Sequence, residues 1–291
     1  MGIKTGFVGF AAMTRSRKGK LQKTVIGATT MAYRHDASGQ LEAENTSRSF
    51  ASDHAGRLSR FTVRAGAGPA SVVARYLYDA SGQRVKKLVR KAGGDESTVY
   101  IDGLFEHLRS GGAEQCVLHI MDDERRIAVM KIGAPLPGDG ASDKPVQYHL
   151  GDHLDSSDLV IGGASAADAS LIRREEYTPY GVTSFGSYGR KRYRYTAKEC
   201  DEESGLYYVG ARYYAPWLAR WTSCDPTGLA AYTNLFVLRR QQSHDVARRR
   251  RRRSEASTGR TGSRVPPEGQ RQGRPRPTIG GLLKGRARAR R

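Results

Sequence analysis

The chain has 291 residues, of which 38% are hydrophobic, and it contains 34 Gly and 15 Tyr. This composition favours a turn-rich β protein over a helical one. The three cysteines, Cys116, Cys200 and Cys224, have no CxxC spacing, which argues against a disulfide framework and against a zinc site. The longest apolar runs fall far short of the ~20 residues that a membrane-spanning helix needs, so no span is predicted.

The net charge of +20 is unevenly distributed. Residues 239–291 contain 18 Lys/Arg and 3 Asp/Glu, a net charge of +15. The preceding 238 residues contain the other 31 Lys/Arg and 26 Asp/Glu, a net charge of +5. The strongly basic character therefore belongs to the C-terminal part of the chain.

Residues 1–29 are predicted to be an irregular segment. Their weakly apolar stretch Gly6–Met13 is followed, rather than preceded, by its main basic cluster, so it is a poor match to a signal peptide. Residues 30–110 carry a degenerate repeat, aromatic-x-x-Asp-x-x-Gly-polar, which an apolar residue follows within a few positions. Its copies begin at Tyr33, Phe50 and Tyr76.

Each copy predicts a strand, a turn and the next strand. The Asp side chain can accept hydrogen bonds from backbone N–H groups just ahead of it, and the Gly can adopt the positive φ of the turn. The third copy contains Tyr78, Asp79 and Gly82. We expect the aromatic residue at the strand end to stack on the equivalent residue of a neighbouring hairpin.

Residues 111–238 are predicted to form a separate region that begins with strand-like runs. A dense polar stretch follows at Tyr148–Asp158, where His149 and His153 have His-x-x-x-His spacing. Gly151 and the polar run favour a loop rather than a helix, and the Asp spacing is not that of an EF-hand. We therefore predict a turn stabilised by Asp side chains and no metal site.

The block Tyr193–Gly228 is rich in Tyr and Trp interleaved with charged residues, and it ends at Asp225-Pro226-Thr-Gly228. Its aromatic residues come in adjacent pairs, which face both sides of a strand rather than one stripe of a helix. We predict an all-β fold of meandering antiparallel hairpins. The residues assigned to the structural motif are Tyr76, Tyr78, Asp79, Gly82, Tyr207, Tyr208, Arg212, Tyr213, Tyr214, Trp221, Pro226 and Gly228.

The repeats and this block, together with the segments EEYTPYG and PWLARW, resemble the Rhs/YD-repeat family and its repeat-associated core of the toxin-complex type. The resemblance covers roughly residues 30–238. It implies a partial β-shell that encapsulates or presents a C-terminal effector, in a secreted or extracellular protein. It also implies other YD-repeat shell segments, or a toxin-complex partner protein, as binding partners.

The sequence departs from the family pattern at several positions. Asp155, Ala197 and Ala219 stand where the family usually has Gly, and Cys200 stands where it usually has Arg. At Asp155 the missing Gly predicts local backbone strain in a tight turn.

The resemblance also implies self-cleavage by two DPxG motifs acting as an aspartyl protease on their own chain. Asp225 matches the first motif, and Arg220 matches the Arg of the family's GR(F/W) sequence. The second motif would begin near Ala247, where arginines stand instead, so we predict a structural Asp-Pro turn and no enzyme activity. No cofactor is predicted. The adjacent acidic pairs Glu175-Glu176 and Glu202-Glu203, and the run Asp122-Asp123-Glu124, are expected to be solvated charges on opposite strand faces.

Residues 239–291 contain no Phe, Tyr or Trp, so they cannot bury a core and are predicted to be disordered. Their charge predicts incidental binding to nucleic acid or anionic surfaces without sequence preference. Glycan binding by the aromatic hairpins is an alternative to stacking among themselves. The family pattern stops at Asn234–Leu238, so we expect a C-terminally truncated relative. One hypothesis is a reading-frame change just after Phe236 or Val237, which YVRNNP and a second DPxG in another frame would support.

Overall fold

The computed structural model describes residues 12–16, 20–123, 125–140, 144–163, 165, 167–186, 191–225 and 235–236. By its internal contacts the chain divides into Met1–Ala247 and Arg248–Arg291, and every residue described below belongs to the first unit. The predicted tail 239–291 lies outside the described residues. Among the described residues, no helix has the length and apolarity that crossing a membrane requires.

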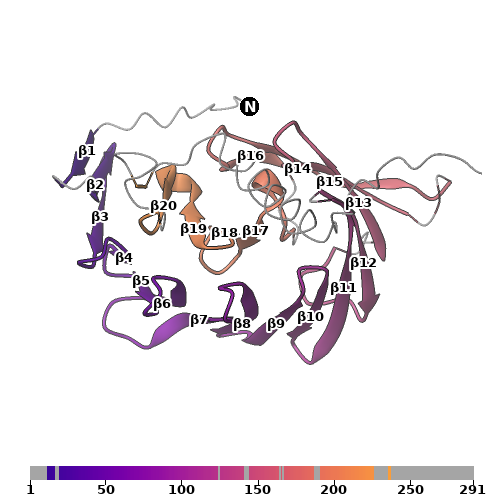
Figure 1. Ribbon diagram of the computed structural model, residues 1–291, viewed down its shortest axis with the longest axis horizontal. Coiled ribbons are helices and arrows are strands. Elements are labelled where there is room, and N and C mark those ends of the chain that lie inside the picture. The colour runs from indigo at the N-terminus through magenta and orange to yellow at the C-terminus, as the bar shows by residue number, and fades with distance from the viewer. Residues whose placement is uncertain are drawn as a thin grey trace, which may run out of the picture. The chain divides into compact units, whose positions relative to one another are not determined.

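In the described part of the chain, sixteen strands form one sheet in sequence order, each antiparallel to the next (Figure 1). This meander of hairpins confirms the predicted all-β fold. The strands are β1 (Ala12–Arg15), β2 (Leu21–Ile26), β3 (Thr29–His35), β4 (Leu41–Glu44), β5 (Arg48–Ser52), β6 (Leu58–Arg64), β7 (Ala70–Tyr78), β8 (Arg84–Lys91), β9 (Gly94–Ile101), β10 (Phe105–Ser110), β11 (Ala113–Asp122), β12 (Arg125–Gly133), β13 (Val146–Gly151), β14 (Ser157–Gly162), β15 (Ser170–Tyr177) and β16 (Thr183–Gly186).

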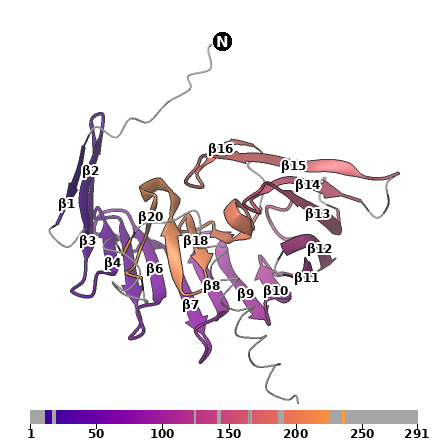
Figure 2. The same ribbon diagram turned by 45° about the horizontal axis from the view of Figure 1, so that its top comes forward.

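The core block forms a second, four-stranded sheet. Its strands follow one another on the inner side of the curve that the large sheet describes (Figures 1 and 2). Its elements are the 3-10 turn η1 (Tyr195–Ala197), β17 (Glu199–Asp201), β18 (Leu206–Val209), β19 (Arg212–Ala215), the 3-10 turn η2 (Pro216–Leu218) and β20 (Arg220–Trp221).

The three repeat copies end in the same turn. In the first, the Asp36 Oδ1 atom accepts a hydrogen bond of 2.8 Å from the backbone N–H of Gln40, four residues ahead. Asp53 and Asp79 do the same at 2.9 and 2.8 Å. The glycines of the three turns have φ of 92°, 75° and 84°. The roles predicted for Asp and Gly are therefore confirmed.

The same backbone pattern recurs where the sequence frame is not evident. In the turns that begin at Asp152, Thr178 and Arg194, the first residue donates its N–H to the carbonyl four residues ahead. The residue three positions after the first donates its own N–H to the carbonyl of that first residue. Its φ is positive in all three, although this residue is Asp155 in the first turn and Ala197 in the third.

The three positions where the family usually has Gly all have left-handed backbone. Asp155, Ala197 and Ala219 have φ of 61°, 54° and 51°. An L-residue with a Cβ atom pays a steric cost in this region that Gly does not. The left-handed backbone that underlies the strain predicted at Asp155 is therefore present, and the same conformation occurs at two alanines of the core block.

The adjacent aromatic pairs of the core block face both sides of their strands, as predicted. Tyr208 and Tyr213 pack together toward the repeats, with ring centroids 5.3 Å apart. Tyr207 and Tyr214 belong to a separate cluster on the opposite side. The repeat aromatic Tyr76 does not stack as predicted, because it meets Tyr213 of the core block at 5.4 Å rather than the equivalent residue of a neighbouring hairpin. Phe50 of the second copy lies against Phe61 of the next strand, with ring centroids 5.2 Å apart.

Candidate functional site: the buried charge network

Two cations of β8 meet two carboxylates of β17 between the two sheets. The Arg84 Nη1 atom lies 2.8 Å from Asp201 Oδ2, and the Lys87 Nζ atom lies 2.7 Å from Asp201 Oδ1. Arg84 also pairs with Glu199, and Lys87 lies 3.3 Å from the same carboxylate. None of these four side chains is more than 10% exposed. The local cause is period-2 alternation, which places Glu199 and Asp201 on one face of β17.

The network continues toward β10 through Arg192. Its guanidinium lies 2.6 Å from Glu199 Oε1 and also pairs with Glu106, whose side chain is 2% exposed. Burial alone would raise the pKa of Glu106, but Arg192 and His119 together lower it to about 2. Burial likewise opposes ionisation of Glu199, and Arg192, Arg84 and Lys87 hold its pKa well below the ordinary value. The carboxylates are therefore charged and matched by cations.

His119 of β11 has a defined tautomer in this network. The Arg126 Nε–H donates to His119 Nδ1 at 2.9 Å, and a guanidinium can only donate. Nδ1 is therefore the acceptor, and Nε2, which faces Glu106 Oε1 at 3.2 Å, carries the hydrogen. Arg126 also lies over the Tyr193 ring, 3.4 Å from its centroid, and Tyr193 donates to Glu106. His119 of β11 thus lies between Tyr193, the first residue of the core block, and Arg126 of β12.

A smaller charge cluster lies beside β15. Glu175 is fully buried and pairs with Lys191 at 3.1 Å, while Tyr177 donates to it at 2.6 Å. The prediction that this acidic pair is solvated is therefore wrong for Glu175, although Glu176 is 52% exposed and faces the other side. It is also wrong for Glu203, whose side chain is 7% exposed beside Lys87. Asp122 and Asp123 are exposed, as predicted. Glu124 lies outside the described residues.

The structure places the two predicted catalytic residues with different partners. Asp225 Oδ2 lies 2.8 Å from Arg212 Nη2, and the Arg212 guanidinium lies over the Trp221 ring at 4.0 Å. Arg220 is buried in β20 opposite Ala215, and it lines a cleft with Leu21, Tyr33, His35 and Phe236. Asp225 therefore pairs with Arg212, which the sequence assigned to the structural motif. Pro226, Gly228 and the position of the second motif lie outside the described residues.

The His149 segment is a turn, as predicted. Asp152 Oδ1 accepts from the backbone N–H groups of Leu154 and Ser156 at 2.7 and 2.9 Å. His149 is turned inward against Ser157, with 2.9 Å between Nδ1 and Oγ, and His153 is exposed. In the part of the chain that the structure describes, no three His, Cys, Asp or Glu side chains gather to hold a metal ion.

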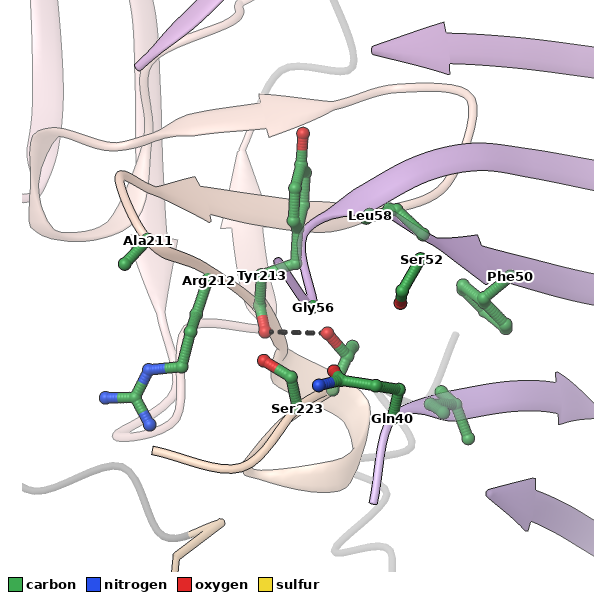
Figure 3. Close-up of a pocket in the computed structure, with 11 residues that line it drawn as sticks. Gln40, Phe50, Ser52, Gly56, Leu58, Ala211, Arg212, Tyr213 and Ser223 are labelled. Atoms are coloured by element: carbon green, nitrogen blue, oxygen red, sulfur yellow. Dashed lines mark hydrogen bonds between the residues drawn. The ribbon is translucent and has the colours of Figure 1, made fainter. Parts of the chain in front are cut away.

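A cleft lies where the turns of the first two repeats meet the core block (Figure 3). Its wall is fixed by a hydrogen bond of 3.1 Å from Thr222 Oγ1 to the Tyr213 carbonyl (Figure 3). The lining contains one charged side chain, Arg212, and no carboxylate, histidine or cysteine.

Comparison with known proteins gives sequence relatives among toxin subunits, while no protein-family model matches the chain. Toxin subunit YenC1 of Yersinia entomophaga is 34% identical over 196 residues, covering 62% of this chain and 20% of that protein. Toxin subunit YenC2 of the same organism is 32% identical over 178 residues, covering 55% of this chain and 18% of that protein. The chain thus matches about a fifth of each subunit's length.

The fold matches solved structures of toxin complexes. The crystal structure of TcdB2-TccC3-Cdc42 superposes over 80% of this chain and 13% of that chain, with a TM-score of 0.63 and 23% identity. TcdB2-TccC3 without its hypervariable C-terminal region covers the same 80%, with a TM-score of 0.62 and 22% identity. The sequence relatives and the shared fold support an Rhs/toxin-complex-type β-shell, which the repeats and the core block predicted.

Proposed function

We propose that the chain is a structural shell segment that, in a longer assembly, encloses or presents the polypeptide that follows its core block. The observation that carries this proposal is the buried charge network. Buried ion pairs join β8 to β17, so the core block is held on the inner side of the repeat sheet. Such pairs are costly to break singly, and they specify one docked arrangement.

The path of the chain at the end of the core block supports the same function. The Leu41 N–H donates to the Thr222 carbonyl at 2.8 Å, so the chain after β20 is bound to the edge of the first repeat. The Trp221 N–H donates to the carbonyl of Phe236 at 3.0 Å, and Phe236 is buried. The downstream polypeptide therefore starts from a position attached to the inner sheet.

Protease protection of the basic tail tests enclosure. Trypsin has abundant sites in residues 239–291, which contain 18 Lys/Arg. The full chain is digested alone and after co-expression with a YD-repeat polypeptide that supplies further shell strands. We expect the tail to be cut rapidly in the chain alone and to be protected in the complex.

The matched control is the variant Asp201→Asn, which keeps the shape of the side chain but removes one buried charge that holds the core block. This variant should lose the protection. A tail that is cut equally fast with and without the partner would overturn the proposal.

A further inference from the structure

The polarity of the large sheet inverts along its length. In β2–β8 the inward positions are largely apolar, as at Phe61 and Val89, whereas the outward positions carry exposed Arg60 and Arg75. In β10–β15 the buried inward positions include a set of polar residues. These are Glu106, Gln115, His119, Gln147, Arg173 and Glu175.

The outward positions of the same strands include many apolar residues, which form continuous rows. One row of cross-strand partners crosses five strands, and its members are Ile120, Ala128, Tyr148, Ile161 and Leu171. Within this row Ala128 is buried by its larger neighbours. Tyr148 and Leu171 are 46% and 61% exposed. A second row runs beside it from Ile101 to Val146 through Leu118. A third row joins Ile132 to Cys116 and His107. We call this surface the outer apolar face.

The size of the outer apolar face exceeds what scattered surface residues produce. Strands lie about 4.8 Å apart, and outward residues recur about every 6.8 Å along each strand. Five to six strands with three outward positions each give a footprint of roughly 500 Å². Contiguous exposed patches of this size commonly mark interaction sites.

The charges around the outer apolar face are paired within the chain. Arg109 meets Glu114 at 2.9 Å, and Arg125 meets Asp155 at 3.0 Å. Arg174 meets Glu176 at 2.7 Å, so the described rim presents balanced pairs rather than a single sign. A nucleic acid or an anionic membrane would select unpaired cations. An extended peptide adds to a sheet edge rather than to a face.

We propose that the outer apolar face of β10–β15 is the interface of a symmetric dimer with a second copy of this chain. A flat apolar surface with balanced charges is complementary to itself, which is the requirement of an isologous contact. Two sheets can then pack face to face about 10 Å apart, with their outward side chains interdigitating. A footprint of about 500 Å² per copy is at the small end for stable interfaces, so we expect a weak dimer that forms at high protein concentration.

The oligomeric state tests this proposal. Light scattering after gel filtration at high salt, which suppresses contacts of the basic tail, should give twice the monomer mass of 32.0 kDa for the full chain at high concentration. Ile132→Lys places a charge in the contact twice per dimer and should weaken dimerisation about 100-fold or more. The matched control is Leu77→Lys, because Leu77 is 50% exposed against 51% for Ile132 but lies on β7 outside the face. It should remain a dimer.

A second measurement does not depend on a variant that folds. Cys116 is the cross-strand partner of Ile132 and lies on the outer apolar face. Its alkylation rate, followed by peptide mapping, should fall as the protein concentration rises. A monomer at high concentration, a dimer that Ile132→Lys leaves intact, or a Cys116 rate independent of concentration would each overturn the proposal.

Discussion

Arg84 and Asp201 are 117 residues apart in the sequence and form an ion pair of 2.8 Å with no exposed surface on either side chain. Arg84 follows the turn of the third repeat, and Asp201 ends the first strand of the core block. Burial opposes the charge on Arg84, yet Asp201 and Glu199 keep its pKa well above the ordinary value. The pair therefore stays ionised and ties the two sheets together.

We predict that Arg84→Met lowers the free energy of unfolding by about 3–5 kcal/mol, because it leaves two buried carboxylates with too few cations. Urea unfolding followed by Trp fluorescence measures the change. The matched control is Arg34→Met, which breaks an ion pair of 3.0 Å with Glu42 in which Arg34 is 73% exposed. That exposed pair should contribute less than about 1 kcal/mol. Equal effects in the two variants would contradict a docking role for Arg84.

We also predict that glycine at the strained turn positions stabilises the protein. Ala219 has φ of 51° at the end of η2, where a Cβ atom costs about 1–2 kcal/mol. Part of this gain is lost, because Gly has more conformational freedom in the unfolded chain. Ala219→Gly and Ala197→Gly should each raise the free energy of unfolding by about 0.5–1 kcal/mol.

The control for this prediction is Ala211→Gly. Ala211 is exposed in the turn between β18 and β19, and it is not among the described residues with positive φ. There the substitution has only its entropic cost, and it should destabilise the protein by about 0.5 kcal/mol. A loss of stability at all three alanines would show that their φ angles carry no strain.

Local features were predictable from the sequence. The Asp and Gly of each repeat dictate a turn, and adjacent aromatics dictate two-sided burial, because both depend only on neighbouring residues. Distant strands decide which face of a strand becomes covered, so the local sequence pattern does not predict the burial of Glu175 and Glu203. A signal for the buried charge network is present at Glu199-x-Asp201. Alternation with a period of two places both acids on one face of the strand.

The partner of Asp225 could not be read from spacing. Arg220 matches the family motif and is nearer in sequence, but alternation on β20 places it on the face toward Leu21 and Leu41. Arg212 precedes β20 by one hairpin, and the antiparallel return of β19 and β20 brings it over Trp221. A contact across a hairpin requires the register, which the sequence pattern does not specify.

The basic tail predicts binding driven by charge alone. Deleting residues 239–291 removes 18 Lys/Arg and 3 Asp/Glu, and it should abolish retention on heparin and binding to duplex DNA. A full chain with the same tail residues in scrambled order should bind as well as the natural one. Fluorescence anisotropy over a salt series measures both. Loss of binding on scrambling would point to a sequence-specific site instead.

We predict that Asp225→Ala does not change the size of the expressed protein. Self-cleavage of the aspartyl type needs two carboxyl groups, and the position of the second DPxG motif holds arginines instead. Wild type, Asp225→Ala and the control Asp122→Ala, an exposed acid, should all run as one band near 32.0 kDa. A smaller fragment that appears in wild type and Asp122→Ala but not in Asp225→Ala would contradict this prediction.

The stability of the protein should fall as the pH drops below neutrality, because burial, with Arg126 and Lys191 nearby, lowers the pKa of His149 to about 3. The unfolded chain takes up this proton near pH 6.5, so stability is present above that pH and lost as the pH falls toward 3. Between pH 7.5 and 5 the loss that His149 contributes should be about 2 kcal/mol. Urea unfolding across this range should show most of it removed in His149→Gln. The exposed control His153→Gln should keep it, and an unchanged slope in His149→Gln would exclude this residue as its source.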